Sequence, residues 1–315
     1  MTSTPQIEPA FQAFLSANQL PASYLNQAKA QFGTLANAII QRHQQQGTVV
    51  VGINGSQGSG KSTLADYLKT LLESQHDLTV AVVSLDDFYL GRASRQALAA
   101  NLHPLLATRG VPGTHDMPLA QATLTALKQQ RQGNIKLPRF DKANDDCFAK
   151  NQWPSIAAPV DVTLFEGWCV GAKPQSESQL KTPINPLELK QDIGGEWRHS
   201  VNQQLAGPYQ QLFANIDIMA MLKAPSFSCV KSWRLEQEEK LAKKLQNQSI
   251  KKAGKAEQPQ ASTASQLMNA EEIGQFVMFF QRLTEHMLTT MPEDVDFLYS
   301  LDSDRRIINP ETVPA

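Results

Sequence analysis

Eight consecutive residues, Gly55 to Ser62 (GSQGSGKS), match the phosphate-binding pattern G-x-x-x-x-G-K-[ST] at every position. Glycine lets the backbone fold closely around an anion, so that successive N–H groups point at phosphate oxygens. A helix starting near Lys61 would add unpaired N–H groups and the positive end of its dipole. We expect Lys61 to reach the β- and γ-phosphates of a nucleotide and the Ser62 hydroxyl to bind Mg²⁺. The predicted nucleotide-binding residues are Gly55, Ser56, Gln57, Gly58, Ser59, Gly60, Lys61, Ser62 and Thr63.

Acidic residues follow two other apolar segments of the chain. Asp86 and Asp87 come after the segment 78–85, and Glu166 ends the segment 160–165. A carboxylate in such a place can accept the proton of an attacking hydroxyl or bind the metal ion of a nucleotide. The alternative role for an aspartate here is to cap the following turn. One of the two aspartates is predicted to be the catalytic base, and Ser62, Glu166 and Asp86 are the predicted metal ligands.

Five short apolar segments are expected to form the strands that position these residues. They are residues 48–53, 78–85, 160–165, 216–222 and 295–301, with helices expected at 62–72 and 270–291. Strands that alternate with helices predict a mostly parallel sheet, and such sheets bind ligands at the carboxyl ends of their strands. Because the glycine-rich motif lies between a strand and a helix, a chance Gly/Ser loop is disfavoured. The predicted fold is a three-layer α/β/α nucleotide-binding fold.

Several regions lie outside this core. Residues 1–46 carry apolar positions at helical spacing and predict a helical N-terminal extension of the main domain, residues 47–315. Within that domain we expect an excursion over the acceptor site at about 88–158 and a helical lid at about 226–266. Residues 172–197 are rich in proline and glycine and predict a long irregular excursion.

Composition limits the class of protein. A hydrophobic content of 41% with 19% charged residues is typical of a globular chain. The net charge of −1 gives no reason to expect binding to nucleic acid or to a membrane. Cys147, Cys169 and Cys229 are far apart without metal-ligand spacing, and we expect reduced thiols. The start of the sequence has no signal-peptide pattern, so we expect a cytoplasmic protein. We expect it to be a monomer or a homodimer.

Four further segments narrow the family. SLDDFY, NLHPLLATRGVPGTHD, LPRFDK and LFEGW together resemble the P-loop D-glycerate 3-kinase family, which is related to uridine kinase, phosphoribulokinase and bacterial pantothenate kinase. The resemblance runs from about Val49 to Leu301 and is much more specific than the phosphate loop alone. It implies that Asp86 matches the general base of uridine-kinase-like enzymes, that Asp87 is the adjacent second acid, and that Glu166 matches their metal-linked glutamate.

The expected acceptor site lies in two loops between the second and third strands. These loops carry Arg109, His115, Asp116, Arg139, Asp141 and Lys142. Glycerate has a carboxylate, and the planar fork of an arginine can pair with it through two hydrogen bonds. The alternatives are a solvated cation, an arginine that ties loops together, and, for His115, a structural histidine. The predicted substrate-binding residues are Asp87, Tyr89, Arg109, His115, Arg139 and Lys142.

A basic segment follows the fourth strand. Residues 231–255 contain eight Lys or Arg against three Glu, a local charge of +5. Such a segment can close over bound ATP, exclude water and bring an arginine to the transferring phosphoryl group. By analogy with other P-loop kinases, Arg234 is the candidate catalytic arginine. The alternative is a solvated helix face.

These residues predict an enzyme that uses ATP and Mg²⁺ to phosphorylate a hydroxyl of a small molecule. By resemblance the acceptor is D-glycerate and the product 3-phosphoglycerate. Other acceptors, such as a nucleoside, pantothenate or a sugar phosphate, are the nearest alternative. An ATPase or switch that acts on a protein partner is a different class of alternative. An inactive scaffold is disfavoured because Lys61, Ser62, Asp86 and Glu166 are all present.

Overall fold

The computed structural model of the chain describes residues 7–236 and 269–308. Its centre is a parallel five-stranded sheet in the order β2-β7-β1-β8-β9, which confirms the predicted fold class. The five strands are β1 (Val49–Gly55), β2 (Val80–Ser84), β7 (Val162–Gly167), β8 (Ile218–Lys223) and β9 (Phe297–Ser300). Each falls within a residue or two of an apolar segment expected from the sequence.

The strand order places the carboxyl ends of three strands together. β1 lies in the middle of the sheet, between β7 and β8, and β2 pairs with the other edge of β7. Glu166 of β7 is in register with both Ile53 of β1 and Ser84 of β2. The phosphate-binding loop after β1 and the two aspartates after β2 therefore leave the sheet at the same level as Glu166.

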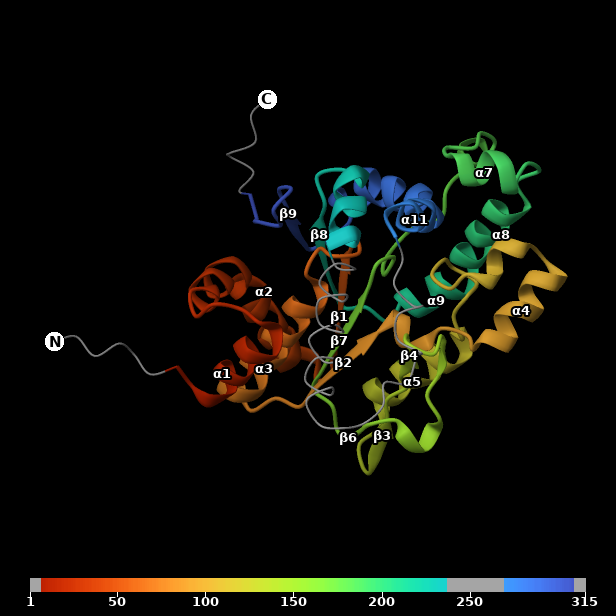
Figure 1. The fold of residues 1–315 in the computed structure, drawn as a ribbon. Helices are drawn as coiled ribbons and strands as arrows, with labels where there is room; N and C mark the ends of the chain where they lie inside the picture. Colours follow the sequence, from red (N-terminus) through yellow and green to blue (C-terminus); the bar gives the residue numbers. More distant parts are fainter. Residues whose placement is uncertain (1–6, 237–268, 309–315) are drawn as a thin grey trace, which may run out of the picture.

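Helices cover both faces of the sheet (Figure 1). The longer helices include α1 (Pro9–Asn18), α2 (Tyr24–Gln46), α3 (Lys61–His76), α4 (Arg92–Asn101), α5 (Met117–Gln129), α8 (Glu196–Gln204) and α11 (Ala270–Thr290). α1, α2 and α3 lie on one side, and α5, α9 (Gln210–Phe213) and α11 lie on the other. This arrangement is the predicted three-layer α/β/α fold.

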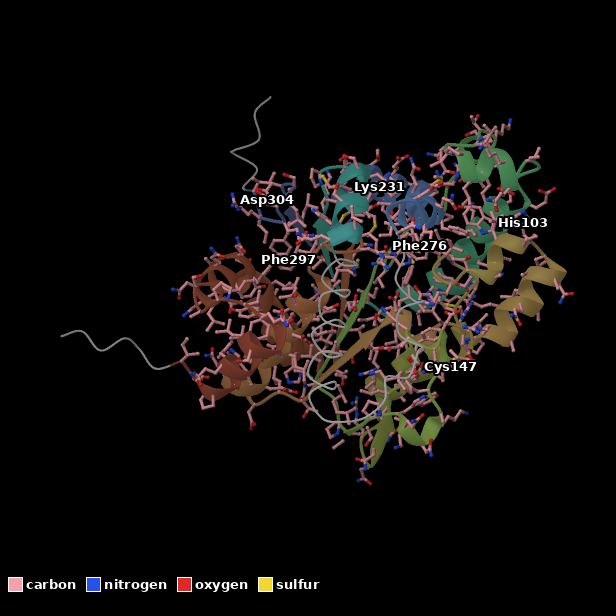
Figure 2. The ribbon with its side chains drawn as sticks, viewed as in Figure 1. His103, Cys147, Lys231, Phe276, Phe297 and Asp304 are labelled. Atoms are coloured by element: carbon pink, nitrogen blue, oxygen red, sulfur yellow. The ribbon has the colours of Figure 1, made fainter. Side chains whose placement is uncertain are left out.

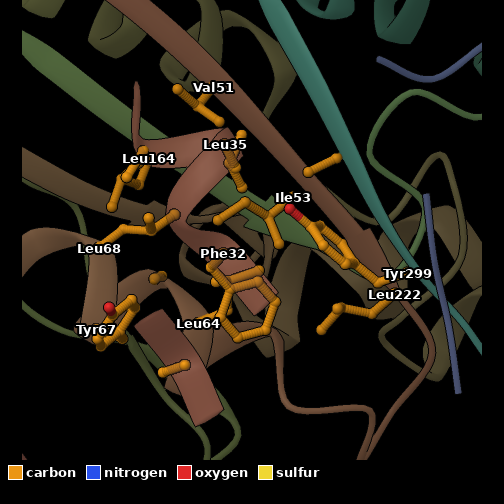
Figure 3. Packing of buried hydrophobic residues seen from close by; sticks show 14 of the residues in the cluster. Phe32, Leu35, Val51, Ile53, Leu64, Tyr67, Leu68, Leu164, Leu222 and Tyr299 are labelled. Carbon is orange, nitrogen blue, oxygen red and sulfur yellow. The ribbon is translucent and has the colours of Figure 1, made fainter. Parts of the chain in front are cut away.

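The period of two along β1 divides its side chains between two cores. Val49, Val51 and Ile53 join the cluster under α1–α3, whereas Val50 joins the cluster under α5 and α11. Figure 3 shows the first cluster, in which Val51 and Ile53 pack with side chains from α2 and α3. Burying one such aliphatic side chain contributes about 1.5–3 kcal/mol, so the central strand is held from both faces. A strand buried on both sides explains the continuous apolar run in the sequence.

The N-terminal helices pack on α3 through aromatic side chains. Tyr67 of α3 lies 6.3 Å from Phe11, 6.0 Å from Phe14 and 6.2 Å from Phe32, measured between ring centroids. Phe32 also meets Tyr299 of β9 at 5.0 Å with its ring edge. α1 and α2 therefore share one hydrophobic core with the sheet.

The prediction of an irregular excursion at 172–197 was wrong in part. The structure forms α6 (Glu177–Leu180), α7 (Pro186–Gln191) and the start of α8 there. Two buried ion pairs hold these short helices, between Glu188 and Arg282 of α11 and between Asp192 and Arg198. Because the carboxylates are fully buried, losing either arginine would leave an unpaired charge in the interior. Tertiary contacts of this kind are not visible in local composition.

The expected lid lies partly outside the described residues. Residues 227–236 form a helix, and the remaining part of the predicted lid, residues 237–266, lies outside the described ranges. Where the chain is described, no helix combines the length and the apolar character that crossing a membrane requires.

Candidate active site

The phosphate-binding loop connects the end of β1 at Gly55 to the start of α3 at Lys61. Gly58 and Gly60 have φ angles of 80° and 100°, in the left-handed region that glycine adopts most easily. A Cβ atom on Gly58 would come within 2.8 Å of Cβ of Trp233, so there is no room for a side chain. Gly60 is the N-cap of α3 and has no side chain to accept the first N–H groups of the helix. The loop and the helix start therefore present backbone donors at one place.

Polar atoms of the loop fit a phosphate ligand. The hydroxyl groups of Ser56 and Ser59 are buried without a hydrogen-bond partner. The Lys61 ammonium donates to the backbone carbonyl of Ser56 at 3.2 Å. Buried hydroxyls without partners are costly unless a ligand satisfies them, and phosphate oxygens accept such hydrogen bonds. The cradle thus has the donor set that the sequence pattern predicts, and Thr63 lies beside it in the first turn of α3.

Strand β7 places Glu166 next to the phosphate-binding loop. The Ser62 hydroxyl donates to Oε1 of Glu166 at 3.3 Å, and Glu166 is buried. Within residues 7–236 and 269–308, no group of three or more His, Cys, Asp or Glu side chains could hold a metal ion by itself. A hydroxyl and one carboxylate suit Mg²⁺, which keeps several waters and takes other oxygens from the phosphates. Ser62 and Glu166 therefore form a pair of oxygen ligands that fits Mg²⁺.

Asp86 lies in a short helical turn, η1 (Leu85–Phe88), directly after β2. Its carboxylate accepts hydrogen bonds from the Tyr89 hydroxyl at 2.9 Å and from the Lys142 ammonium at 2.7 Å. Burial alone would raise the pKa of Asp86, but the charge and hydrogen bond of Lys142 outweigh it and lower the pKa to about 2. Asp86 is therefore ionised at neutral pH.

Asp87 has a different partner. Its carboxylate pairs with Arg139 at 3.1 Å and accepts the backbone N–H of Phe140 at 3.4 Å. Burial raises the pKa of Asp87, and the Arg139 charge opposes this shift without cancelling it. The segment LPRFDK thus lies across both aspartates, with Arg139 on Asp87 and Lys142 on Asp86.

Tyr89 and His115 form a stacked pair next to Asp86. Their ring centroids lie 4.5 Å apart, and Nδ1 of His115 is hydrogen-bonded to the hydroxyl of Tyr209. That hydroxyl also accepts the N–H of Gly113 at 3.1 Å. The second ring nitrogen, Nε2, is buried without a partner. Burial lowers the pKa of His115 to about 4, against a smaller effect of Asp86, and the ring is neutral at pH 7.

Arg109 is already paired with another residue of the acceptor-site loops. Its guanidinium forms an ion pair with Asp145 and lies over the ring of Phe140 at 5.5 Å. Asp145 also pairs with Arg95, whose side chain is only 1% exposed. This is the loop-tying role that the sequence left open for an arginine. Arg109 still lies close enough to Tyr89 to lower the pKa of its hydroxyl against the larger effect of burial.

The structure brings the predicted acceptor residues into one contact network but only partly into one pocket. Asp87, Tyr89 and Arg139 line a pocket of about 730 Å³ that is open to solvent and also contains Cys147 and Trp153. Arg109, His115 and Lys142 do not line it and lie on the side of Asp86 and Phe140. Arg234 places its guanidinium 5.8 Å from the ring of Phe276 on α11.

Sequence reasoning did not find several residues of the site. The residues that were missed are Arg95, Phe140, Asp145, Tyr209, Trp233 and Arg305. Phe140 lies in LPRFDK, a segment that resembles the kinase family, so its aromatic residue could have been singled out. Nothing in the spacing marks Asp145 or Arg305, because their partners are distant in the sequence.

Comparisons with known proteins agree with this geometry. No family model matches the chain. A kinase of Schizosaccharomyces pombe, named uncharacterized kinase mug58, is 37% identical over 206 residues, which cover 62% of this chain and 72% of that protein. The chloroplastic D-glycerate 3-kinase of Arabidopsis thaliana is 34% identical over 199 residues, 60% of this chain but only 41% of the plant protein. The solved structure of D-glycerate 3-kinase from Cryptococcus neoformans superposes with a TM-score of 0.69 at 25% identity, covering 92% of this chain and 98% of that one. The chain belongs to this family of P-loop kinases.

Membership of the P-loop kinase family explains why the cradle and the acids occur together. The solved D-glycerate 3-kinase structure from Cryptococcus neoformans shares the fold over 92% of this chain. The chain is accordingly a kinase with a P-loop nucleotide site.

Proposed function

We propose that this kinase transfers the γ-phosphoryl group of ATP to a hydroxyl of a small carboxylated metabolite, D-glycerate, and forms 3-phosphoglycerate. The observation that carries the proposal is the position of Lys142, 2.7 Å from Asp86. A flexible cation held against the predicted base is a ready partner for an acceptor that has a hydroxyl and a carboxylate close together. Two of the related kinases bear the name D-glycerate 3-kinase.

Asp86 is the proposed general base. Its carboxylate follows the strand next to Glu166, and it is ionised because Lys142 stabilises the charged form. The Tyr89 hydroxyl, which donates to Asp86 at 2.9 Å, keeps one carboxylate oxygen oriented. The proton of the attacking hydroxyl then goes to Asp86 while that hydroxyl oxygen bonds to the γ-phosphorus and the bond from phosphorus to the departing ADP oxygen breaks.

Lys61 and the backbone of the loop bind the phosphates. On binding, the Lys61 ammonium exchanges the carbonyl of Ser56 for phosphate oxygens, and the serine hydroxyls of the loop gain acceptors. Ser62 and Glu166 are the residues that would hold Mg²⁺. When bound, Mg²⁺ supplies positive charge that neutralises the phosphate oxygens during transfer.

The acceptor carboxylate is proposed to take over Lys142. In the structure the ammonium of Lys142 pairs with Asp86 and the lysine side chain is 61% exposed, so a ligand can reach it from solvent. Arg139 uses one N–H of its guanidinium on Asp87 and retains other donors for a carboxylate. This exchange would favour an acceptor whose carboxylate lies next to the reacting hydroxyl.

A matched pair of acceptors tests the proposal. Glycerol has the hydroxyls of D-glycerate but no carboxylate, so ADP release should be much faster with D-glycerate than with glycerol at equal concentration. Uridine, pantothenate and ribulose 5-phosphate complete the panel, and phosphorus NMR identifies the position of the new phosphate. Preference for another acceptor would replace the substrate, and equal ADP release with and without any acceptor would indicate an ATPase or switch.

A further inference from the structure

The chain after β9 returns to the phosphate-binding loop as a tight turn. Leu301 bridges to Ile307, and the carboxylate of Asp302 accepts the backbone N–H groups of Asp304 and Arg306 at 2.8 Å each. Arg305 has a φ of 67°, which is uncommon for a residue with a side chain. The turn thus holds a strained residue and directs its side chain away from the neighbouring Arg306.

The Arg305 guanidinium contacts three parts of the molecule at once. Its Nε donates to the backbone carbonyl of Gly58 at 2.8 Å, and it pairs with the carboxylate of Glu236. It also lies over the ring of Trp233 at 5.2 Å. Arg305 therefore links the C-terminal turn, the phosphate loop and the helix of residues 227–236.

Trp233 completes this contact from the helix. Its side chain is 2% exposed, packs against Gly58, and donates through Nε1 to the carbonyl of Ser303 at 2.8 Å. Figure 2 shows Asp304 of the turn and Lys231 of the helix in the same upper part of the molecule. Trp233 of the helix and Arg305 of the turn therefore both contact the phosphate loop at Gly58.

Arg305 contacts a peptide group that shares a hydrogen-bond partner with Lys61. The carbonyl of the Gly58–Ser59 peptide is held by Arg305, and its N–H donates to the carbonyl of Ser56 at 3.1 Å. That same Ser56 carbonyl accepts the Lys61 ammonium at 3.2 Å. Glycine can adopt either orientation of the peptide with little strain. Without Arg305, the peptide could turn its carbonyl towards the phosphates and repel them.

We infer that Arg305 is a positioning residue for nucleotide binding, which fixes the Gly58–Ser59 peptide so that the phosphate loop and Lys61 are preset for the phosphates of ATP. Because Arg305 acts on the phosphate loop, we expect it to affect nucleotide binding and not acceptor binding. The role is independent of whether the acceptor is D-glycerate.

The test compares Arg305→Ala and Arg305→Lys with Arg306→Ala. Arg306 is the matched control because it is the next arginine, is 78% exposed and has only a 4.0 Å contact with Asp304. Titration calorimetry with Mg·ATP should give a Kd raised about tenfold or more for Arg305→Ala, since a charged hydrogen bond is lost. Arg305→Lys should lie between that variant and the wild type, and Arg306→Ala should match the wild type.

Two further measurements separate positioning from mere stability. Deuterium uptake of the segment 55–62 should rise in Arg305→Ala and stay unchanged in Arg306→Ala, because the Ser59 amide loses its fixed orientation. In kinetics, KM for ATP should rise while KM for the acceptor stays constant. Wild-type ATP affinity and loop exchange in both Arg305 variants would overturn the inference, as would equal rises in the two KM values with a lowered Tm.

Discussion

The phosphate cradle and the acceptor side of the site differ in how their polar groups are satisfied. In the cradle, the hydroxyls of Ser56 and Ser59 are buried without partners. On the acceptor side, the charged groups are already paired, Lys142 with Asp86, Arg139 with Asp87, and Arg109 with Asp145. The cradle can thus bind phosphates by gaining contacts, whereas an acceptor must exchange existing ones.

This difference assigns different tasks to the two regions. Buried polar groups without a partner contribute directly to affinity, because ligand binding removes the cost of a buried unsatisfied donor. Groups that must change partners give selectivity, because only a ligand with matching charge can replace the lost ion pair. We therefore expect mutations in the cradle to affect every reaction, and mutations on the acceptor side to affect carboxylated acceptors selectively.

Replacing Lys61 should have the largest effect. Lys61→Met should lower kcat by about 10²–10³, because the charge that develops on the phosphoryl oxygens loses a preset partner. Lys69→Met is the control, since Lys69 lies on the same helix and contacts Glu73 and the Val80 carbonyl instead. Steady-state kinetics with any accepted substrate measures both. Similar losses in the two variants would mean that α3, rather than the cradle, is being disturbed.

Acceptor-side cations should give a smaller and selective effect. Lys142→Met and Arg139→Met should each raise KM for D-glycerate about tenfold or more, and leave KM for ATP unchanged, because each removes a charged hydrogen-bond donor. Lys173→Met is the control, since Lys173 is exposed and pairs with Asp294. If both variants retain the wild-type KM for D-glycerate, the carboxylate is bound elsewhere.

Two glycines contrast the cradle with a helix position that has room for a side chain. Gly58→Ala should lower the free energy of unfolding by about 1–3 kcal/mol, because the new Cβ meets Trp233 and φ is positive. Gly33→Ala should raise it by up to about 1 kcal/mol, since α2 has open space at that position. Urea denaturation of both variants measures the two signs. Equal effects would remove the argument that Trp233 restricts the loop.

Acid should weaken the acceptor side through His115. Its folded pKa of about 4 lies below the value of 6.5 for a free histidine, so the unfolded chain binds more protons between these pH values. Stability should therefore fall as the pH drops from 6.5 towards 4, with a contribution from His115 of at most about 1.4 kcal/mol per pH unit. Besides Asp86, the groups that face the ring are Tyr89 and Tyr209, which stay neutral.

Urea midpoints at pH 7, 6 and 5 test this dependence. The difference between the wild type and His115→Gln should shrink as the pH falls, because the variant lacks the titrating ring. His76→Gln, at the exposed end of α3, serves as the comparison. A pH slope that is identical in the wild type and in His115→Gln contradicts the assignment.

The sequence allowed prediction of the parts that depend on neighbouring residues. The cradle is one continuous motif, and a strand buried on both faces is visible as an apolar run, as in residues 48–53. The acids at the strand ends followed from the same pattern. Their partners, Lys142 and Arg139, come from a loop some fifty residues later, and sequence alone could name them only as candidate cations.

Contacts between distant segments could not be predicted. Arg305 and Gly58 are 247 residues apart, and Tyr209 and His115 are 94 apart. No local period or motif connects such pairs, because only the folded arrangement of the whole chain brings them together. The ion pair of Glu188 with Arg282 shows the same limit, since it stabilises short helices where local composition indicated irregular chain.

ADP release measured with and without D-glycerate tests the central claim most directly, in the wild type and in Asp86→Asn. The account predicts release that depends on D-glycerate, and a loss of about 10²–10⁴ in Asp86→Asn because the general base is removed. Release that is independent of D-glycerate, or that survives unchanged in Asp86→Asn, would contradict it.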